Sequence, residues 1–443
     1  MRRIYSDYAY GPGPRTGCWW DETIAATEWE RLDGSLRVDV AIVGGGFTGL
    51  SAALTLAEAG VRVAVFEAET PGWGASGRNG GFCCLGGSRL GNPQIQQIYG
   101  TEARDHYYEV ERAAIALVAD RIDQHEIDVD RHSDGETLLA HSVRAWDGMR
   151  RSADAYAAQY GVELDLTEQA GLHGKGMNGP FHGAMTNPLG FALNPRKYLF
   201  GLAAAAIQAG ARLFQNAPVA DIQPAAGRVI LQTSAGEVRC DQVILATNGY
   251  SSEDVLPWLA GRYMPSQSNV IVTRPMTKAE LDAQGWTSLQ ASYDSRNLLH
   301  YFRLMPDRRF LFGMRGGLRS SLASEKRARA RNRADFERMF PAWAHVETPH
   351  SWSGMVNLAA AAMPFVGPVP DHPGVFAAMC YHGNGVAMGS WAGTALARSL
   401  LDPTTARAIP APMRQPLKRF PFGAARRLIM PPLYALLKLA DLR

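Results

Sequence analysis

The sequence has few cysteines, little net charge and no long apolar run, and each of these shortages excludes a class of protein. Its five cysteines form no C-x-x-C pair and no zinc-binding spacing, so we expect no metal site. Cys83 and Cys84 are adjacent, and because a bridge between neighbours is strained, we expect free thiols in a reducing compartment. The net charge of +3 is too small to indicate nucleic acid as a partner.

Signals for membrane insertion and secretion are also missing. No uninterrupted apolar run reaches the length of a membrane span, and the first twenty residues lack the apolar centre of a secretory signal. We therefore expect a cytoplasmic protein. The content of 46% hydrophobic and 20% charged residues is typical of a globular protein. At 443 residues the chain is too long for one simple core, which suggests two interleaved domains.

The chain does contain a complete phosphate-binding unit near its N-terminus. Residues 38–43 are an apolar run typical of a buried parallel strand, and GGGFTG at 44–49 follows at once and fits G-x-G-x-x-G. The first glycine allows a tight turn, the second lets the backbone approach a pyrophosphate, and the third lets helix pack on strand. Residues 50–59 are expected to form a helix whose N-terminus faces the phosphates, and 61–66 a second strand. The predicted cofactor contacts are Gly44, Gly46, Phe47, Thr48, Gly49, Ala68 and Glu67, whose carboxylate can accept hydrogen bonds from ribose hydroxyls.

A second glycine-rich loop, GWGASGRNGG at residues 72–81, favours FAD over NAD as the dinucleotide. It offers backbone N–H groups, a hydroxyl, a guanidinium and an amide to a further stretch of cofactor. The predicted contacts are Gly74, Ala75, Ser76, Gly77, Arg78, Asn79, Gly80 and Gly81.

With these loops the sequence resembles the D-amino-acid oxidase superfamily of FAD-dependent oxidoreductases. The likeness is greatest to the γ-glutamylputrescine-oxidase-like and glycine/sarcosine-oxidase-like amine oxidases. It implies an α/β fold, in which a Rossmann-like FAD-binding domain is interleaved with an α+β substrate domain built on an antiparallel sheet. It also implies FAD contacts from Val219, from the turn Thr247, Asn248 and Gly249, and from the loop Gly383, Asn384, Gly385 and Val386 before a helix. Cys380 precedes that loop, so we expect FAD to be bound noncovalently.

The chain order of these segments predicts a discontinuous architecture. We expect a helix at 101–123, and two antiparallel strands within 298–318 that roof the flavin ring. The predicted parts are an N-terminal segment (1–35), an FAD-binding domain (36–90, 195–255 and 350–405), a substrate domain (91–194 and 256–349) and a basic, apolar tail (406–443).

The candidate catalytic residues lie where the roof and the C-terminal loop would converge. An amine oxidase must hold a C–N bond against the flavin and receive the amine in its neutral form, so its site can be largely aromatic with a few polar groups. Because side chains alternate along a strand, only one of His300 and Tyr301 should face the pocket. Arg315 is either a fork for a substrate carboxylate or a structural arginine. The complete candidate set is His300, Tyr301, Arg303, Arg315 and His382, which would be a pocket wall or an electrostatic group.

These observations favour FAD-dependent oxidation of the C–N bond of a small amine or amino acid to an imine that hydrolyses. Oxygen would reoxidise the flavin with release of hydrogen peroxide. No lysine falls in a segment predicted at the flavin face, so a histidine or an arginine supplies the positive charge there, or oxygen is not the acceptor. Two alternatives stay open: a dehydrogenase that passes electrons to a quinone or a carrier protein, and a flavin-binding accessory subunit without turnover.

Two basic segments have structural interpretations. Residues 326–333 alternate basic residues with alanine, which is typical of the solvated face of an amphipathic helix rather than of a nucleic-acid site. The tail from 411 to 443 is basic and ends in an apolar helix. It either packs against the protein or a second subunit, or lies on an anionic membrane surface.

Overall fold

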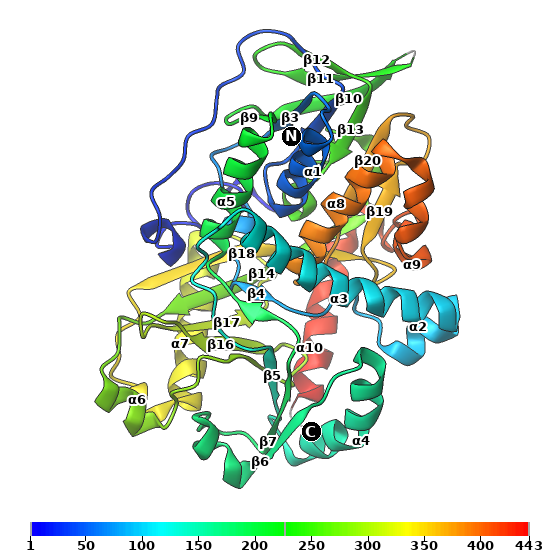
Figure 1. Cartoon of the computed structure of the whole chain (residues 1–443). Helices are drawn as coiled ribbons and strands as arrows, with labels where there is room; N and C mark the ends of the chain where they lie inside the picture. Colours follow the sequence, from blue (N-terminus) through cyan, green and yellow to red (C-terminus); the bar gives the residue numbers. More distant parts are fainter. Residues whose placement is uncertain (1, 226, 442–443) are drawn as a thin grey trace.

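The structure is a computed structural model, and it describes residues 2–225 and 227–441 (Figure 1). Residues 1, 226 and 442–443 fall within the predicted N-terminal segment, FAD-binding domain and tail, and they lie outside the described residues. The fold is α/β and contains two large sheets, in agreement with the predicted class. The six-stranded sheet lies in the upper half of Figure 1 and the eight-stranded sheet in the lower half.

The six-stranded sheet contains the predicted phosphate-binding unit. Its strands from β20 to β9 are parallel, and only the edge strand β19 runs antiparallel. The four residues of β2 and of β3 are all buried, as expected of strands covered on both faces. The order is β19 (Phe365–Pro368), β20 (Val375–Met379), β13 (Gln242–Leu245), β2 (Val40–Val43), β3 (Val63–Phe66) and β9 (Arg212–Phe214).

Alternate residues of these strands face two different layers. Ile42 and Val65 pack with the helices on one side, whereas Val43 and Phe66 pack with a second, four-stranded sheet on the other. The helical layer comprises α1 (Phe47–Glu58), α5 (Pro195–Gln208) and α8 (Ala387–Leu401), with α3 (Thr101–Gln124) against α8. The opposite layer comprises β1 (Leu36–Arg37), β12 (Glu237–Cys240), β11 (Arg228–Thr233) and β10 (Val219–Ala225).

The eight-stranded sheet is antiparallel except between β15 and β5. The two strands predicted within 298–318 are confirmed as β16 and β17, which pair antiparallel. β18 falls in a segment predicted for the FAD-binding domain, yet it pairs with β14 in this sheet, and the domain division stays a prediction. The order is β18 (His350–Ala359), β14 (Tyr263–Val272), β17 (Phe310–Arg315), β16 (His300–Leu304), β15 (Ala291–Asp294), β5 (Glu136–Leu139), β7 (Gly183–Asn187) and β6 (Asp165–Glu168).

One face of this sheet forms an aromatic core beneath α7 (Leu322–Met339). Phe302 and Phe312 pack there with Phe336 of the helix. Asn332, Phe336 and Met339 are the buried residues of α7, and most basic side chains of 326–333 are exposed, so the predicted amphipathic helix is confirmed. The remaining elements are β4 (Phe82–Cys83), β8 (Phe191–Ala192), α2 (Asn92–Tyr99), α4 (Val143–Tyr160), α6 (Lys278–Gln284), α9 (Ala411–Arg414) and α10 (Met430–Ala440).

The tail follows α8 and returns along the eight-stranded sheet. Arg426 is buried, and its guanidinium donates to Glu253 Oε1 over 2.6 Å and to the Tyr263 carbonyl over 2.9 Å. Beyond it, the hydroxyl of Tyr434 in α10 lies 2.7 Å from Ser266 Oγ. None of the described helices combines the length and the hydropathy that crossing a membrane requires.

Candidate active site

A cavity of about 620 Å³ lies between the carboxyl ends of the parallel strands and one face of the eight-stranded sheet. The loops that follow β2, β3, β13 and β20 form one side of it, which is the usual position for a ligand in an open α/β sheet. The structure brings together here most of the predicted cofactor residues: Gly44, Gly46, Phe47, Thr48, Glu67, Ala68, Gly74, Ala75, Ser76, Arg78, Asn79, Gly80, Val219, Thr247, Asn248, Gly383, Asn384, Gly385 and Val386.

Four predicted cofactor glycines do not line the cavity: Gly49, Gly77, Gly81 and Gly249. They lie behind the wall of the cavity, in contact with neighbouring segments of the chain. A Cβ atom at Gly49 would be 2.0 Å from the Gly44 carbonyl oxygen, and one at Gly77 would be 2.1 Å from that of Gly72. Glycine is needed at these two positions because a side chain would overlap the neighbouring backbone and force the loop segments apart.

The dinucleotide end of the cavity contains a buried carboxylate and a helix N-terminus. Glu67 accepts hydrogen bonds from the Gly45 N–H over 2.8 Å and the Glu69 N–H over 3.1 Å. Burial raises the pKa of Glu67. At the start of α1 no side chain caps the helix from Gly46, and the Phe47 N–H donates to Ser76 Oγ over 3.0 Å. Such an N-terminus favours the negative charge of a pyrophosphate.

Arg78 is a second feature that fits a large polar cofactor. Its side chain is buried, its Nη1 donates to the Ser353 carbonyl over 3.2 Å, and its guanidinium lies 5.2 Å from the Tyr250 ring centroid. Its Nε and Nη2 atoms have no hydrogen-bond partner among the described residues. Because an unpaired buried donor is costly, these two atoms call for acceptors that the protein itself does not supply.

The roof of the cavity is aromatic at Tyr301. Its hydroxyl lies 2.9 Å from Ser268 Oγ, and its ring packs edge-on against Phe82. A Cβ atom at Gly313 would lie 2.2 Å from the Tyr301 ring, so the glycine of β17 makes room for this side chain. Tyr301 is thus fixed both at its ring and at its hydroxyl.

Arg315 brings a positive charge into the same space. Its guanidinium lines the cavity and forms no hydrogen bond or ion pair with the described residues. Burial and the neighbouring Arg89 lower its pKa. Arg315 Nη2 would be 2.6 Å from a Cβ atom at Gly383, so the guanidinium lies directly against the C-terminal loop. A guanidinium group in this position can bind an anionic ligand through its N–H donors.

His382 lines the cavity but is neutral. Its Nδ1 lies 2.7 Å from the Gly87 carbonyl oxygen, and its Nε2 accepts the Ala359 N–H over 3.1 Å. This pattern requires the ring proton on Nδ1. Burial lowers the pKa of His382 to about 4, which removes it as a source of positive charge near neutral pH. Its role in the structure is to fix the loop that begins at Gly383.

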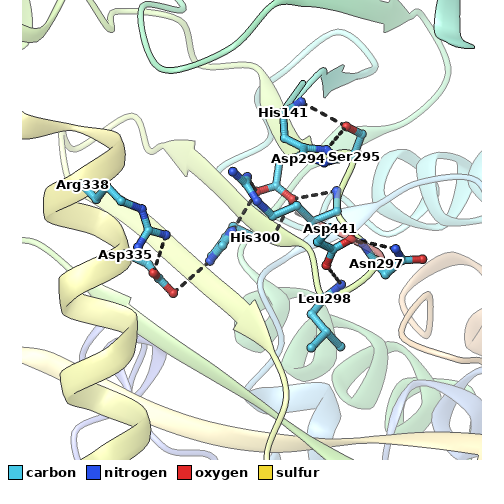
Figure 2. Close-up of polar contacts among 10 residues, drawn as sticks. His141, Asp294, Ser295, Asn297, Leu298, His300, Asp335, Arg338 and Asp441 are labelled. Atoms are coloured by element: carbon cyan, nitrogen blue, oxygen red, sulfur yellow. Dashed lines mark hydrogen bonds and ion pairs between the residues drawn. The ribbon is translucent and has the colours of Figure 1, made fainter. Parts of the chain in front are cut away.

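The structure does not bring His300 to the other candidates. His300 and Tyr301 point to opposite faces of β16, and His300 stacks on Phe312 beneath the sheet. Figure 2 shows its ring between two carboxylates, with Nδ1 2.7 Å from Asp294 and Nε2 3.2 Å from Asp335. As expected, only one residue of the pair faces the pocket, and it is Tyr301. The position of His300 does not support a catalytic role.

Arg303 also lies outside the cavity lining. It is fully buried, and it donates to the Leu193 carbonyl over 2.8 Å and contacts His132 Nε2 at 3.2 Å. Burial lowers its pKa to about 9. These contacts join β16 to the segment that precedes α5.

The cavity residues that the sequence analysis missed include Glu136 of β5 and Tyr293 of β15. β5 pairs with β15 in parallel across a long separation in the chain, so only the sheet register brings Glu136 near Tyr293, which in turn lies opposite Tyr301. Nothing in the local pattern ETLL distinguishes Glu136 from a solvent-facing strand residue. A prediction of the whole sheet order would have been needed to find it.

A mainly parallel sheet with a cavity at its carboxyl edge and a second sheet as its roof is the architecture expected of an FAD-binding protein. Comparison with protein families agrees, because the model of the DAO family, described as FAD dependent oxidoreductase, matches residues 39–399. The chain belongs to this family and is therefore an FAD-dependent oxidoreductase, as predicted.

Individual relatives cover most of the chain. It is 31% identical to a probable oxidoreductase OrdL of Haemophilus influenzae, over 82% of this chain and 83% of the relative. It is 30% identical to the gamma-glutamylputrescine oxidoreductase of Escherichia coli K12, over 84% of this chain and 85% of the relative. The solved structure of glycine oxidase from Geobacillus kaustophilus has the same fold, with a TM-score of 0.68, 22% identity, and coverage of 83% of this chain and 95% of that one.

Proposed function

We propose that this enzyme oxidises the C–N bond of a small amine or amino acid to an imine, which water then hydrolyses to a carbonyl compound. The observation that carries the proposal is the shared cavity, in which the cofactor loops end beneath a roof of Tyr301 and an unpaired Arg315. The relatives support this substrate class, since one is named for γ-glutamylputrescine and the solved neighbour for glycine.

FAD fits the residues of this cavity. In this assignment Glu67 would hold the adenosine ribose, the N-terminus of α1 would face the pyrophosphate, and the loop Gly383–Val386 would reach the flavin. The unpaired Nε and Nη2 atoms of Arg78 would donate to cofactor or substrate acceptors. FAD supplies the two-electron acceptor for the C–N bond. Cys380 is not among the cavity residues, which supports noncovalent binding.

The chain's own residues bind and orient the substrate. Tyr301 and Tyr293 provide aromatic walls that exclude water, and Arg315 binds a carboxylate. Neither of the candidate histidines serves as a base, because His382 is neutral with both nitrogens occupied and His300 lies beneath the sheet. Positioning of the amine, rather than a strong acid or base, is the main contribution of this site.

We further propose oxygen as the electron acceptor and hydrogen peroxide as a product. No described lysine lines the cavity, and its cationic side chains are Arg3, Arg78, Arg89 and Arg315. An arginine therefore provides the positive charge that favours oxygen reduction. Arg315 is the first candidate, because its guanidinium lies beside Gly383.

The second candidate is a dehydrogenase that delivers electrons to a quinone or a carrier protein. One feature favours it, namely that α10 exposes Leu433, Leu436 and Leu439 close to basic tail residues, at the side of the eight-stranded sheet. Such a surface suits peripheral contact with an anionic membrane, or with a second subunit, by an otherwise cytoplasmic protein. Sedimentation with anionic and with neutral vesicles, beside the mass of the protein in solution, separates these two contacts.

The decisive experiment is an anaerobic titration of the purified flavoprotein with a panel of γ-glutamylated amines, N-alkylated amines and amino acids. Bleaching of the visible flavin band by at least one of them is expected. If no compound reduces the flavin, the proposed reaction is wrong and a non-catalytic flavin subunit becomes the better account. With a reducing compound in hand, oxygen consumption measured beside dye reduction distinguishes the oxidase from the dehydrogenase.

A further inference from the structure

Glu136 is a buried carboxyl group on the cavity wall that the proposed reaction leaves without a role. It lies on β5, whose neighbour β15 carries Tyr293, and Tyr293 in turn pairs with Tyr301 of β16. Glu136, Tyr293 and Tyr301 all line the cavity, as do Ser268 and Arg315 farther along the same sheet. The sheet therefore presents one carboxyl group and one guanidinium on its substrate-facing side.

Glu136 has no counterion in the part of the chain that the structure describes. Its Oε1 accepts a hydrogen bond from Asn187 Nδ2 over 3.4 Å, and the Cys84 thiol is its other polar neighbour. Neither an arginine nor a lysine among the described residues pairs with it, although its side chain is buried. Taking a carboxylate out of water without a cation is unfavourable, so the site is incomplete in the absence of a positive ligand.

The protonation state of Glu136 can change near neutral pH when such a ligand binds. Burial raises its pKa to about 7, and the buried carboxyl of Glu111 on α3 acts in the same direction. The charged and titratable groups that face it are Glu111, Cys83, Cys84, Tyr156 and Tyr293. Arg315 lies near two of them, Cys84 and Tyr293. At neutral pH the Glu136 carboxyl group is partly protonated, and a cation that binds beside it favours release of the proton.

Arg315 and Glu136 face the same space without neutralising each other. Cys84 and Tyr293 each lie within electrostatic range of both groups. Yet no ion pair joins Glu136 to Arg315 among the described residues. Two opposite charges that line one cavity without pairing with each other are complementary to a ligand that carries both signs.

We propose that Glu136 binds a positively charged nitrogen of the substrate, separate from the neutral amine that is oxidised, and that Glu136 and Arg315 together select dipolar substrates, with an ammonium group and a carboxylate in one molecule. This inference rests on the proposed function, which supplies the amine-oxidising site. It narrows the range of substrates, because a simple alkylamine can bind only to Glu136 and a simple carboxylic acid only to Arg315.

Binding to the oxidised holoenzyme tests the pairing directly. The flavin spectrum is titrated anaerobically with 5-aminopentanoate, pentanoate and pentylamine, which share a chain and differ in their charges. We expect the wild-type protein to bind 5-aminopentanoate more tightly than either of the others. In Glu136→Gln, affinity for 5-aminopentanoate should fall about 10- to 100-fold, to the level of pentanoate, while pentanoate itself is unaffected or binds more tightly.

The matched control is Glu111→Gln. Glu111 is equally buried and also titrates near pH 7, but it binds Tyr160 and does not line the cavity. This variant should keep the preference for 5-aminopentanoate and shift its pH dependence to lower pH. In the wild type, affinity for 5-aminopentanoate should rise between about pH 6 and about pH 8 as Glu136 ionises, and Glu136→Gln should abolish that rise.

Several results would overturn the proposal. Equal losses for pentanoate and 5-aminopentanoate in Glu136→Gln would make the residue structural, and so would a wild-type protein without preference among the three ligands. Failure of the proposed function has a different signature, since it is the absence of flavin bleaching by every amine. A preference for 5-aminopentanoate that is lost in Glu136→Gln, seen without any bleaching, therefore supports the binding site even where the reaction is another one.

Discussion

The guanidinium of Arg426 lies 2.6 Å from Glu253 Oε1, and the two side chains are only 2% and 7% exposed. This ion pair joins the C-terminal tail to the segment after β13, and the Glu253 carboxylate also accepts the Gly261 N–H over 3.1 Å. The part of the tail around Arg426 thus packs against the body of the protein. The exposed apolar side chains that an outside surface would need are Phe422 and Leu428 before α10, and Leu433, Leu436 and Leu439 within it.

Removing Arg426 should therefore destabilise the fold. We expect Arg426→Ala to lower the free energy of unfolding by about 3–5 kcal/mol, because it leaves the Glu253 carboxylate buried without its partner. Chemical denaturation measures this loss. Lys418→Ala is the matched control, since Lys418 is a nearby exposed cation of the tail and its removal should change stability by less than about 0.5 kcal/mol.

Arg315→Ala should leave flavin content intact and weaken carboxylated substrates. The expected loss is about 2–4 kcal/mol in kcat/KM, the range for removing one partner of a buried charged hydrogen bond. Uncharged amines should be much less affected because they never used the guanidinium. Steady-state kinetics on a matched pair of substrates, with and without the carboxylate, measures the difference.

Arg315→Lys refines that measurement. A lysine keeps the charge but not the fork, so it should recover only part of the lost affinity for carboxylates. If Arg315→Ala slows both members of the substrate pair equally, the arginine holds the C-terminal loop at Gly383 rather than the substrate.

His300 predicts a pH-dependent contribution to stability. Burial alone would lower its pKa, but hydrogen bonds to Asp294 and Asp335 outweigh burial, and its pKa is raised above 6.5. A group whose folded pKa is raised stabilises fully below the unfolded value and loses that contribution as the pH rises through the folded value. Replacing His300 with Gln should therefore cost more stability at about pH 6 than at about pH 9. An equal cost at both values, measured by urea denaturation, would show that the ring acts through packing alone.

Gly49 tests the packing of the dinucleotide turn. A Cβ atom there would lie 2.0 Å from the Gly44 carbonyl oxygen, which is backbone and cannot rotate away. Gly49→Ala should therefore yield protein with little bound FAD and a lowered melting temperature. Gly148→Ala in α4 is the control, because nothing lies within 4 Å of its new Cβ. It should be neutral or stabilise the helix by up to about 1 kcal/mol.

The dinucleotide unit could be predicted because its determinants are local. β2, the glycine turn, α1 and β3 follow one another directly, and the strands and Glu67 lie where the pattern placed them. α1 begins at Phe47, earlier than the predicted start at residue 50, because the last turn of the glycine motif is already helical. The glycine motif does not reveal which glycines touch a ligand and which touch backbone. Gly44 lines the cavity and Gly49 does not, although both belong to one motif.

The roof was only partly predictable. The pairing of β16 with β17 follows from neighbouring runs, and strand alternation correctly limits the pocket to one of His300 and Tyr301. It does not say which one, because the choice depends on which face α7 covers. Glu136 could not be found at all, since its place beside Tyr293 depends on a parallel pairing between distant segments.

The strand order of the six-stranded sheet also dictates when this protein can acquire its cofactor. Val40 of β2 pairs with Val63 on one side and with Gln242 on the other, and β13 in turn pairs with β20 near the C-terminus. While the chain emerges from the ribosome, β3 has an open edge until β9 is synthesised, and β2 has one until β13 is synthesised. The loop Gly383–Val386 arrives later still. The complete cofactor site therefore forms only after most of the chain has been made, and until then the unpaired strand edges can pair with other chains.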